Sequence, residues 1–78
     1  MANVTIYSTP YCVYCKMAKI FFAEKNIKFQ DKDVASDTQA REEMMKKSGQ
    51  MGVPVIDIDG KIIIGFDKSK LQELLGTS

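Results

Sequence analysis

The only two cysteines of the chain lie three residues apart, where a strand pattern gives way to a helix pattern. Residues 3–8 alternate Val4 and Ile6 with more polar neighbours, which is typical of a β-strand. From residue 13 onward the spacing becomes helical. The helical positions are Met17, Ile20, Phe21 and Glu24. Cys12 and Cys15 therefore belong to the first turn of a helix that directly follows a strand.

This position favours reactive thiols. The first N–H groups of a helix lack backbone partners and carry the positive end of its dipole, so they stabilise a thiolate, which is the reactive form of cysteine. Residues three apart share one helix face, with Cβ atoms about 5 to 6 Å apart. We expect the exposed Cys12 to be the nucleophile and the shielded Cys15 to be the resolving thiol. Lys16 and Lys19, as flexible surface side chains, are expected to add little.

Two other uses of a cysteine pair are less suited to this chain. A structural zinc site needs four ligands, and the sequence has no histidine and no further cysteine, so carboxylates would have to complete it. A structural disulfide between Cys12 and Cys15 would close a loop of a few residues, where the gain in loop entropy is smallest. Two cysteines at this spacing beside a strand–helix–strand pattern are typical of redox chemistry.

Size and charge limit the remaining possibilities. With 78 residues, of which 45% are hydrophobic, we expect a single domain over residues 1–78. Eleven basic and ten acidic residues give a net charge of +1, which provides no electrostatic basis for binding nucleic acid or a membrane. No signal-like or membrane-spanning stretch is apparent. Since a cycling dithiol suits a reducing compartment, we expect a cytoplasmic protein. The sequence gives no clear sign of an oligomer, so we expect a monomer.

The middle of the chain predicts a strand and a helix. Residues 26–34 alternate apolar and charged side chains, although their second half is too polar for the centre of a sheet. Ser36 is expected to cap a helix, with Gln39 completing a capping box, and Gly49 is expected to end it. Two ion pairs are expected along this helix, between Glu42 and Lys46 and between Glu43 and Lys47.

The last part of the chain predicts a hairpin and a final helix. Apolar runs at 55–58 and 61–64 flank Asp59-Gly60, a strong hairpin signal. Asp67 is expected to cap a helix over 68–75. The first two strands should be parallel, because a helix joins them. The fold class is therefore α/β, in the order βαβαββα, with a four-stranded mixed sheet flanked by three helices.

Pro54 precedes the strand at 55–58 and cannot donate a hydrogen bond to it. A cis bond between Val53 and Pro54 would turn the chain sharply and leave the Val53 backbone free to pair with an extended substrate. Local sequence favours the trans form, because cis bonds are a minority before proline.

Three segments in this order resemble the glutaredoxin family of the thioredoxin fold, over nearly the whole chain. The segments are Tyr11-Cys12-Val13-Tyr14-Cys15, Gly52-Val53-Pro54 and Ile64-Gly65-Phe66-Asp67. The resemblance implies a thioredoxin-like fold, a cis Pro54 beside the thiols, and thiol–disulfide oxidoreduction with Cys12 as nucleophile and Cys15 as resolving thiol. It also implies that the Val53 backbone meets the cysteinyl part of the substrate and that Asp67 holds the amino group of glutathione.

The chain departs from the usual family pattern at several positions, so the resemblance supplies only half of a glutathione site. Thr9 stands in place of a lysine, Gly52 in place of a threonine, and Val13-Tyr14 in place of Pro-Tyr. Lys68 is expected to replace the missing lysine from another side. The segment around Gly65 is more similar to redoxins that serve ribonucleotide reductase and are reduced by thioredoxin reductase, so both electron donors remain open.

The predicted site combines the thiol pair with a groove, and no metal or tightly bound cofactor is expected in it. The substrate- or glutathione-binding residues are expected to be Thr9, Tyr14, Val53, Pro54, Gly65, Phe66, Asp67 and Lys68. The expected partners are glutathione, thioredoxin reductase and proteins that carry disulfides.

Two further hypotheses stay open. Some family members hold an iron–sulfur cluster between two subunits, through the first cysteine and glutathione, and Val13 removes a proline that disfavours this. Alternatively, oxidation of Cys12 and Cys15 could control the binding of a partner protein.

Overall fold

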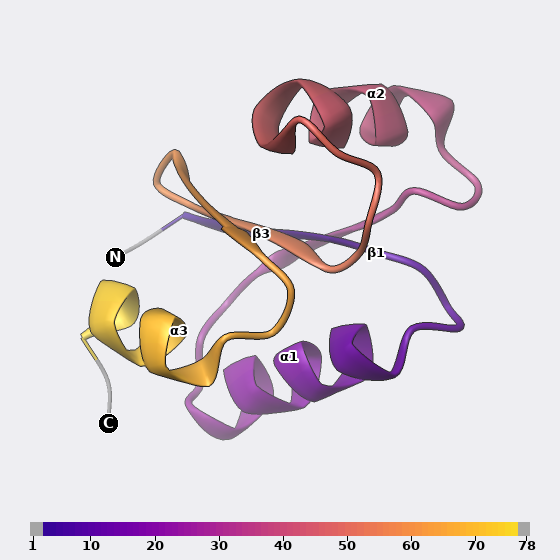
Figure 1. Cartoon of the computed structure of the whole chain (residues 1–78). Helices are drawn as coiled ribbons and strands as arrows, with labels where there is room; N and C mark the ends of the chain where they lie inside the picture. Colours follow the sequence, from indigo (N-terminus) through magenta and orange to yellow (C-terminus); the bar gives the residue numbers. More distant parts are fainter. Residues whose placement is uncertain (1–2, 77–78) are drawn as a thin grey trace.

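The computed structural model describes residues 3–76, and the order of its elements confirms the predicted βαβαββα arrangement. The elements are β1 (Val4–Ser8), α1 (Val13–Glu24), β2 (Gln30–Asp33), α2 (Thr38–Ser48), β3 (Val55–Ile58), β4 (Lys61–Ile64) and α3 (Lys68–Leu75). The strands form one sheet in the order β2-β1-β3-β4 (Figure 1). As predicted, β1 and β2 are parallel, and β3 and β4 pair antiparallel.

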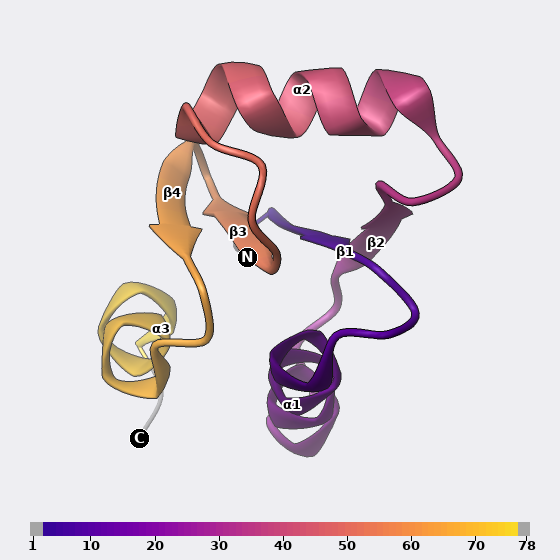
Figure 2. The same cartoon turned by 45° about the vertical axis from the view of Figure 1, so that its right-hand side comes forward.

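The sheet lies between two helical layers. Helix α2 covers one face, and α1 and α3 cover the other (Figure 2). Neighbouring residues of β1 point to opposite faces, so Ile6 packs on the side of α1 and α3 while Tyr7 packs under α2. None of the helices within residues 3–76 has the length and apolar character needed to cross a membrane.

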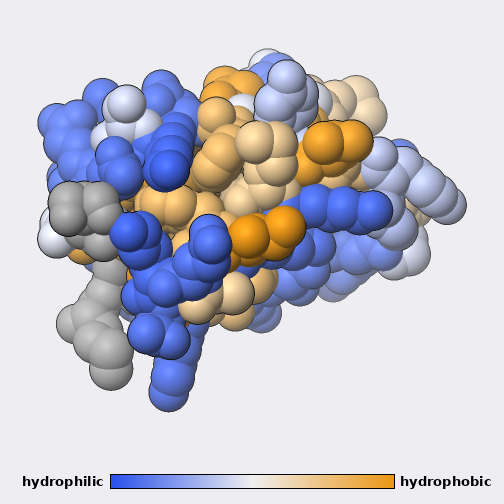
Figure 3. Space-filling model, turned by 90° about the horizontal axis from the view of Figure 1, so that it is seen from below, coloured by the Kyte–Doolittle hydropathy of each residue, from blue (hydrophilic) through white to orange (hydrophobic). Residues whose placement is uncertain are grey.

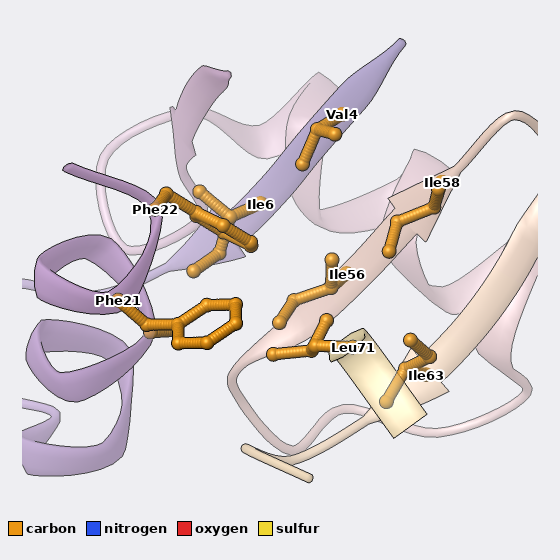
Figure 4. Close-up of a cluster of buried hydrophobic side chains, with 9 residues drawn as sticks. Val4, Ile6, Phe21, Phe22, Ile56, Ile58, Ile63 and Leu71 are labelled. Carbon is orange, nitrogen blue, oxygen red and sulfur yellow. The ribbon is translucent and has the colours of Figure 1, made fainter. Parts of the chain in front are cut away.

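Most of the apolar core lies between the sheet and the pair α1 and α3 (Figure 4). Its buried residues are Val4, Ile6, Ala18, Phe21, Phe22, Ile56, Ile58, Ile63 and Leu71. A smaller cluster under α2 consists of Tyr7, Val34, Ala40, Met44 and Val55. Since α2 contributes only Ala40 and Met44 to the buried core, this helix needs other contacts to hold it on the sheet.

Strand β2 is shorter than the predicted strand at 26–34. It contains only the polar residues Gln30–Asp33 and lies at the edge of the sheet, as their polarity predicted. Ile27 and Phe29 precede the strand and pack half-buried against the larger core. The alternating sequence pattern thus begins before the hydrogen-bonded strand, because side chains that precede a strand can be buried although their backbone is not paired.

The start of α2 differs from the predicted capping box. Asp37, rather than Ser36, is the N-cap, and its carboxylate accepts hydrogen bonds from the backbone N–H groups of Gln39 and Ala40 at 3.0 and 3.2 Å. The Ser36 hydroxyl instead donates to the Asp33 carboxylate. The prediction of Ser36 as N-cap was wrong because an aspartate one residue later reaches the same free N–H groups.

Two charged side chains of α2, Glu43 and Lys47, reach to the sheet instead of pairing with each other. Glu43 pairs with Lys32 at 2.8 Å, and Lys47 pairs with Asp57 at 2.7 Å. The buried Tyr7 hydroxyl donates to Glu43 and accepts from Lys47, so it lies between the two pairs. The predicted Glu43–Lys47 pair is therefore wrong. Within residues 3–76 no ion pair joins Glu42 to Lys46 either.

The hairpin and the last helix agree with the sequence. Asp59 and Gly60 have φ angles of 52° and 90°, the left-handed conformation that a two-residue hairpin turn of this kind requires. The Asp67 carboxylate caps α3 by accepting from the Lys70 backbone N–H at 3.1 Å. Gly49 and Gly76 end α2 and α3 in the left-handed conformation.

Candidate functional site

The thiol pair lies where β1 ends and α1 begins. Cys12 is the N-cap of α1, and its sulfur accepts a hydrogen bond from the Cys15 backbone N–H at 3.1 Å. This role usually belongs to Ser, Thr, Asp or Asn, whose oxygen satisfies a free N–H at the helix start. Here the sulfur of Cys12 takes that role, and the same N–H can stabilise its thiolate.

The two sulfurs differ in environment. Both cysteines are in the free thiol form; Cys12 is half-buried and Cys15 is completely buried. Burial, and next the hydrogen bond with Cys12, raise the pKa of Cys15 to about 12, while a backbone hydrogen bond with Thr9 and the charge of Lys19 act in the opposite direction. The Cys15 thiol therefore keeps its proton at neutral pH while a reduced Cys12 lies beside it.

The segment around Pro54 comes from a distant part of the chain to meet Cys12. The Val53–Pro54 peptide bond is cis, as the family resemblance implied and contrary to the expectation from local sequence. The Cys12 thiol points to the Val53 carbonyl oxygen at 3.9 Å. This approach follows from the sheet order, because β1 and β3 are antiparallel neighbours and the end of β1 lies beside the start of β3.

Gly65 connects the end of β4 to the same segment. Its backbone N–H donates to the Pro54 carbonyl at 2.8 Å. Its φ angle is 83°, a conformation that glycine adopts without the steric penalty of other residues. The structure thus brings together Cys12, Cys15, Val53, Pro54 and Gly65, all of which the sequence predicted to share a site.

The other predicted binding residues differ in their exposure. Tyr14 is exposed on α1, whereas Thr9 is half-buried. The Thr9 carbonyl oxygen accepts a hydrogen bond from the Cys12 backbone N–H at 3.4 Å. Lys68 is exposed at the first position of α3, after the cap Asp67. A role for these four residues in binding glutathione stays a prediction.

Phe66 packs partly against the larger core. Its ring packs edge-on against Phe21 with centroids 6.1 Å apart, and the residue is half-buried. Its exposed part contributes to a shallow pocket between α1 and the start of α3. The pocket is lined by Met17, Ile20, Phe21, Glu24, Phe66 and Lys68.

Sequence patterns did not predict this pocket. Met17 and Ile20 share helical spacing with the buried Phe21, yet they are 42% and 58% exposed. Figure 3 shows apolar side chains gathered across the α1 and α3 side of the molecule, with hydrophilic side chains around them. The sequence did contain an indication of this exposed apolar surface. Apolar residues cover a wider face of α1 than one sheet can bury.

Metal ligands do not cluster in the part of the chain that the structure describes. In residues 3–76 no group of three or more His, Cys, Asp or Glu side chains is arranged to hold a metal ion.

Comparisons with known proteins agree with this geometry. The chain is 51% identical over 72 residues to an uncharacterized glutaredoxin-like 8.6 kDa protein in the rubredoxin operon of Clostridium pasteurianum, covering 92% of this chain and 96% of that protein. It is 43% identical over 67 residues to glutaredoxin 3 of Escherichia coli K12, covering 86% and 81% of the two chains.

Solved structures show the same fold. A mutant of a thioredoxin-like protein superimposes with a TM-score of 0.93 at 31% identity, over the full length of both chains. A glutaredoxin from Archaeoglobus fulgidus gives a TM-score of 0.86 at 26% identity and covers 96% of this chain and 87% of its own. The sequence profile of the glutaredoxin family matches residues 4–63. The chain therefore has the thioredoxin-like fold and belongs to the glutaredoxin family.

Proposed function

We propose that this chain is a dithiol oxidoreductase that reduces disulfides through Cys12 and Cys15. The observation that carries the proposal is the position of the Cys12 sulfur, which lies at the start of α1 and 3.9 Å from the Val53 carbonyl oxygen. Cys15 lies buried behind it in the first turn of the helix. Membership of the glutaredoxin family supports the same class of reaction.

In the first step, the Cys12 thiolate attacks one sulfur of a substrate disulfide. The bond between the two substrate sulfurs breaks, one substrate sulfur leaves as a thiolate and takes up a proton, and the other remains bonded to Cys12. The Cys15 N–H, 3.1 Å from the Cys12 sulfur, and the positive end of the α1 dipole favour the attacking thiolate.

In the second step, the Cys15 thiolate attacks the Cys12 sulfur and releases the reduced substrate. Two of the influences that raise the pKa of Cys15 come from Cys12, namely its hydrogen bond and its charge. Both end when the Cys12 sulfur is held in a mixed disulfide. Cys15 is therefore easier to deprotonate after the first step than before it.

The substrate is expected to lie along the Val53 backbone, in a groove bordered by Tyr14, Pro54, Gly65 and Phe66. The exposed backbone of an X-Pro segment at the end of a strand can pair with an extended chain. Proteins that carry disulfides, and mixed disulfides with glutathione, are the proposed substrates. The proposed location is the reducing cytoplasm, because a cycling dithiol suits that compartment. The proposed working form is a monomer.

Glutathione is the proposed reductant, and thioredoxin reductase is the second candidate. Asp67 and Lys68, next to each other at the exposed start of α3, offer charges of both signs for glutathione. Thr9 and Gly52, which replace the usual lysine and threonine, favour the second donor instead. A charge-assisted hydrogen bond of the kind that a lysine would make contributes about 1.5 to 3 kcal/mol.

A reduction assay on the oxidised protein separates the donors. Turnover is measured with glutathione plus glutathione reductase, and separately with thioredoxin reductase, each with NADPH as the source of electrons. Faster turnover with glutathione is expected. Rapid turnover with thioredoxin reductase alone would contradict the glutathione-dependent proposal and leave the dithiol chemistry in place.

A further inference from the structure

A polar cluster joins three elements of the fold, namely β1, α1 and β2. The Lys19 ammonium group on α1 pairs with the Asp31 carboxylate on β2 at 2.6 Å. The Ser8 hydroxyl, at the end of β1, donates to the other oxygen of Asp31 at 2.7 Å. Ser8 is only 2% exposed and directly precedes the loop that carries Cys12. The proposed chemistry gives no role to this cluster.

Lys19 is held near the resolving thiol. It follows Cys15 by four residues on α1, so the two side chains lie on the same helix face, one turn apart. Its side chain is 31% exposed and ion-paired, in contrast to the flexible surface lysine that the sequence predicted. Three groups act on the Cys15 sulfur besides its burial, namely the Cys12 thiol, the Thr9 backbone and the Lys19 charge.

We infer that Lys19 is a positioning residue for the second step, in which its positive charge favours the thiolate of Cys15 as that sulfur attacks Cys12. The inference rests on the dithiol mechanism proposed above. A buried thiol with no nearby cation loses its proton with difficulty, because charge is costly in an apolar environment. Within residues 3–76, Lys19 is the cation whose charge acts on Cys15.

Cys15 first gives up its proton to solvent. A bond forms between the Cys15 and Cys12 sulfurs, and the bond between Cys12 and the substrate sulfur breaks. The substrate leaves as a thiolate and takes up a proton. The substrate disulfide has then gained two electrons and the cysteine pair has lost two. Lys19 exchanges no proton or electron in this step.

Stopped-flow reaction of the reduced protein with Ellman's reagent separates the two steps. Attack by Cys12 releases one coloured thiolate at a rate that depends on the concentration of the reagent. Attack by Cys15 then releases a second coloured thiolate in an intramolecular phase, whose rate does not depend on the concentration of the reagent. The rate of the second phase as a function of pH reports the ionisation of Cys15 in the mixed disulfide.

Lys19→Met should slow the second phase by about three- to tenfold at pH 7 and move its pH midpoint upward, because a shift of one pKa unit changes the thiolate fraction about tenfold. Lys19→Arg should restore the second phase. Lys16→Met is the matched control, since Lys16 is an exposed lysine on the same helix. It should leave the second phase unchanged.

Asp31→Asn distinguishes charge from a merely structural ion pair. Asparagine still offers an oxygen to Lys19 and leaves the lysine charge in place, so the second phase should run at least as fast as in the parent protein. Slowing equal to that of Lys19→Met would overturn the inference.

Two other results would also overturn it. An unchanged second phase and pH midpoint in Lys19→Met would remove the role of Lys19 alone. Equal slowing by Lys16→Met would assign the effect to net charge instead. Release of only one coloured thiolate by the parent protein would contradict the dithiol mechanism itself. That outcome differs from the results that contradict only the role of Lys19.

Discussion

At the scale of single residues, the contrast between Cys12 and Cys15 governs the chemistry. One sulfur is half-buried at the helix start, and the other is completely buried one turn further on. The structure therefore assigns different substrate access to two residues of identical type. Because only a reachable sulfur can attack a disulfide, substitutions at the two positions should have different consequences.

Cys12→Ser should abolish all reduction of disulfides, because no exposed thiol remains. Cys15→Ser should still form the mixed disulfide at Cys12 but fail to release a protein substrate from it. Mass spectrometry of the trapped species and turnover assays check both variants. Disulfide reduction by Cys12→Ser, with none by Cys15→Ser, would reverse the assigned roles.

The raised pKa of Cys15 also predicts how stability depends on pH. In the reduced folded protein this pKa is about 12, against an ordinary value of 9.0. Below pH 9 the Cys15 thiol keeps its proton in both the folded and the unfolded chain, so its full contribution to the free energy of unfolding is present. Between pH 9 and 12 only the unfolded chain loses it, and the free energy of unfolding should fall by up to about 1.4 kcal/mol per pH unit.

Urea titrations of the reduced protein at several pH values between 8 and 11 measure this slope. Cys15→Ala is the control, and it should show a shallower fall. A residual slope is expected in this variant because the pKa of Tyr7 is also raised, first by burial and then by its hydrogen bond to Glu43. Identical slopes in the two proteins would contradict the prediction.

At the scale of elements, most strands and helices were predictable, and the failures have physical causes. The turn at Asp59-Gly60 and the caps Asp67, Gly49 and Gly76 depend on local backbone chemistry, which the sequence displays directly. The partners of Glu43 were not predictable, because Lys32 and Tyr7 lie on strands far from α2 in the sequence and meet it only in the folded chain. The cis bond before Pro54 required family resemblance, since local preference favours trans.

Helix α2 depends on its polar contacts with the sheet. Glu43→Ala should lower the free energy of unfolding by about 1 kcal/mol, because the buried Tyr7 hydroxyl loses its acceptor and Lys32 loses its partner. Glu42→Ala, at an exposed position of the same helix, is the control and should change stability by less than about 0.5 kcal/mol. Urea unfolding measures both. Equal effects would contradict the assigned contacts.

The start of α3 allows helix capping and ligand binding to be separated. Asn caps helices about as well as Asp, so Asp67→Asn should preserve stability while it removes a negative charge. If Asp67 holds the amino group of glutathione, the KM for glutathione should rise several-fold. Thermal unfolding and donor kinetics measure the two properties. Unchanged kinetics with both donors would remove Asp67 from the proposed glutathione site.

At the scale of the whole molecule, the apolar face extends beyond the cysteines. Val13, which follows Cys12, is 65% exposed, and Met17 and Ile20 continue the exposed apolar surface along α1. Sequence spacing identified these residues as helical but could not predict which of two apolar faces α1 turns to the sheet. That choice depends on the packing of Ala18, Phe21 and Phe22 against the sheet.

This surface lies next to the site and should contact protein substrates but not small ones. Ile20→Ser should raise the KM for a protein disulfide several-fold and leave the KM for a small disulfide unchanged. Met45→Ser, which changes an exposed side chain on α2, is the control. Equal increases for both substrates, or an effect from Met45→Ser, would contradict this assignment.

The hairpin turn at Asp59-Gly60 lies at the end of the sheet far from the thiol pair. β1 and β3 are antiparallel, and Val4 pairs with Ile58 just before the turn while Tyr7 pairs with Val55 near the cysteines. The length of the sheet therefore separates the turn from the thiols. A label attached at this turn would therefore lie away from the site and leave the path to Cys12 open.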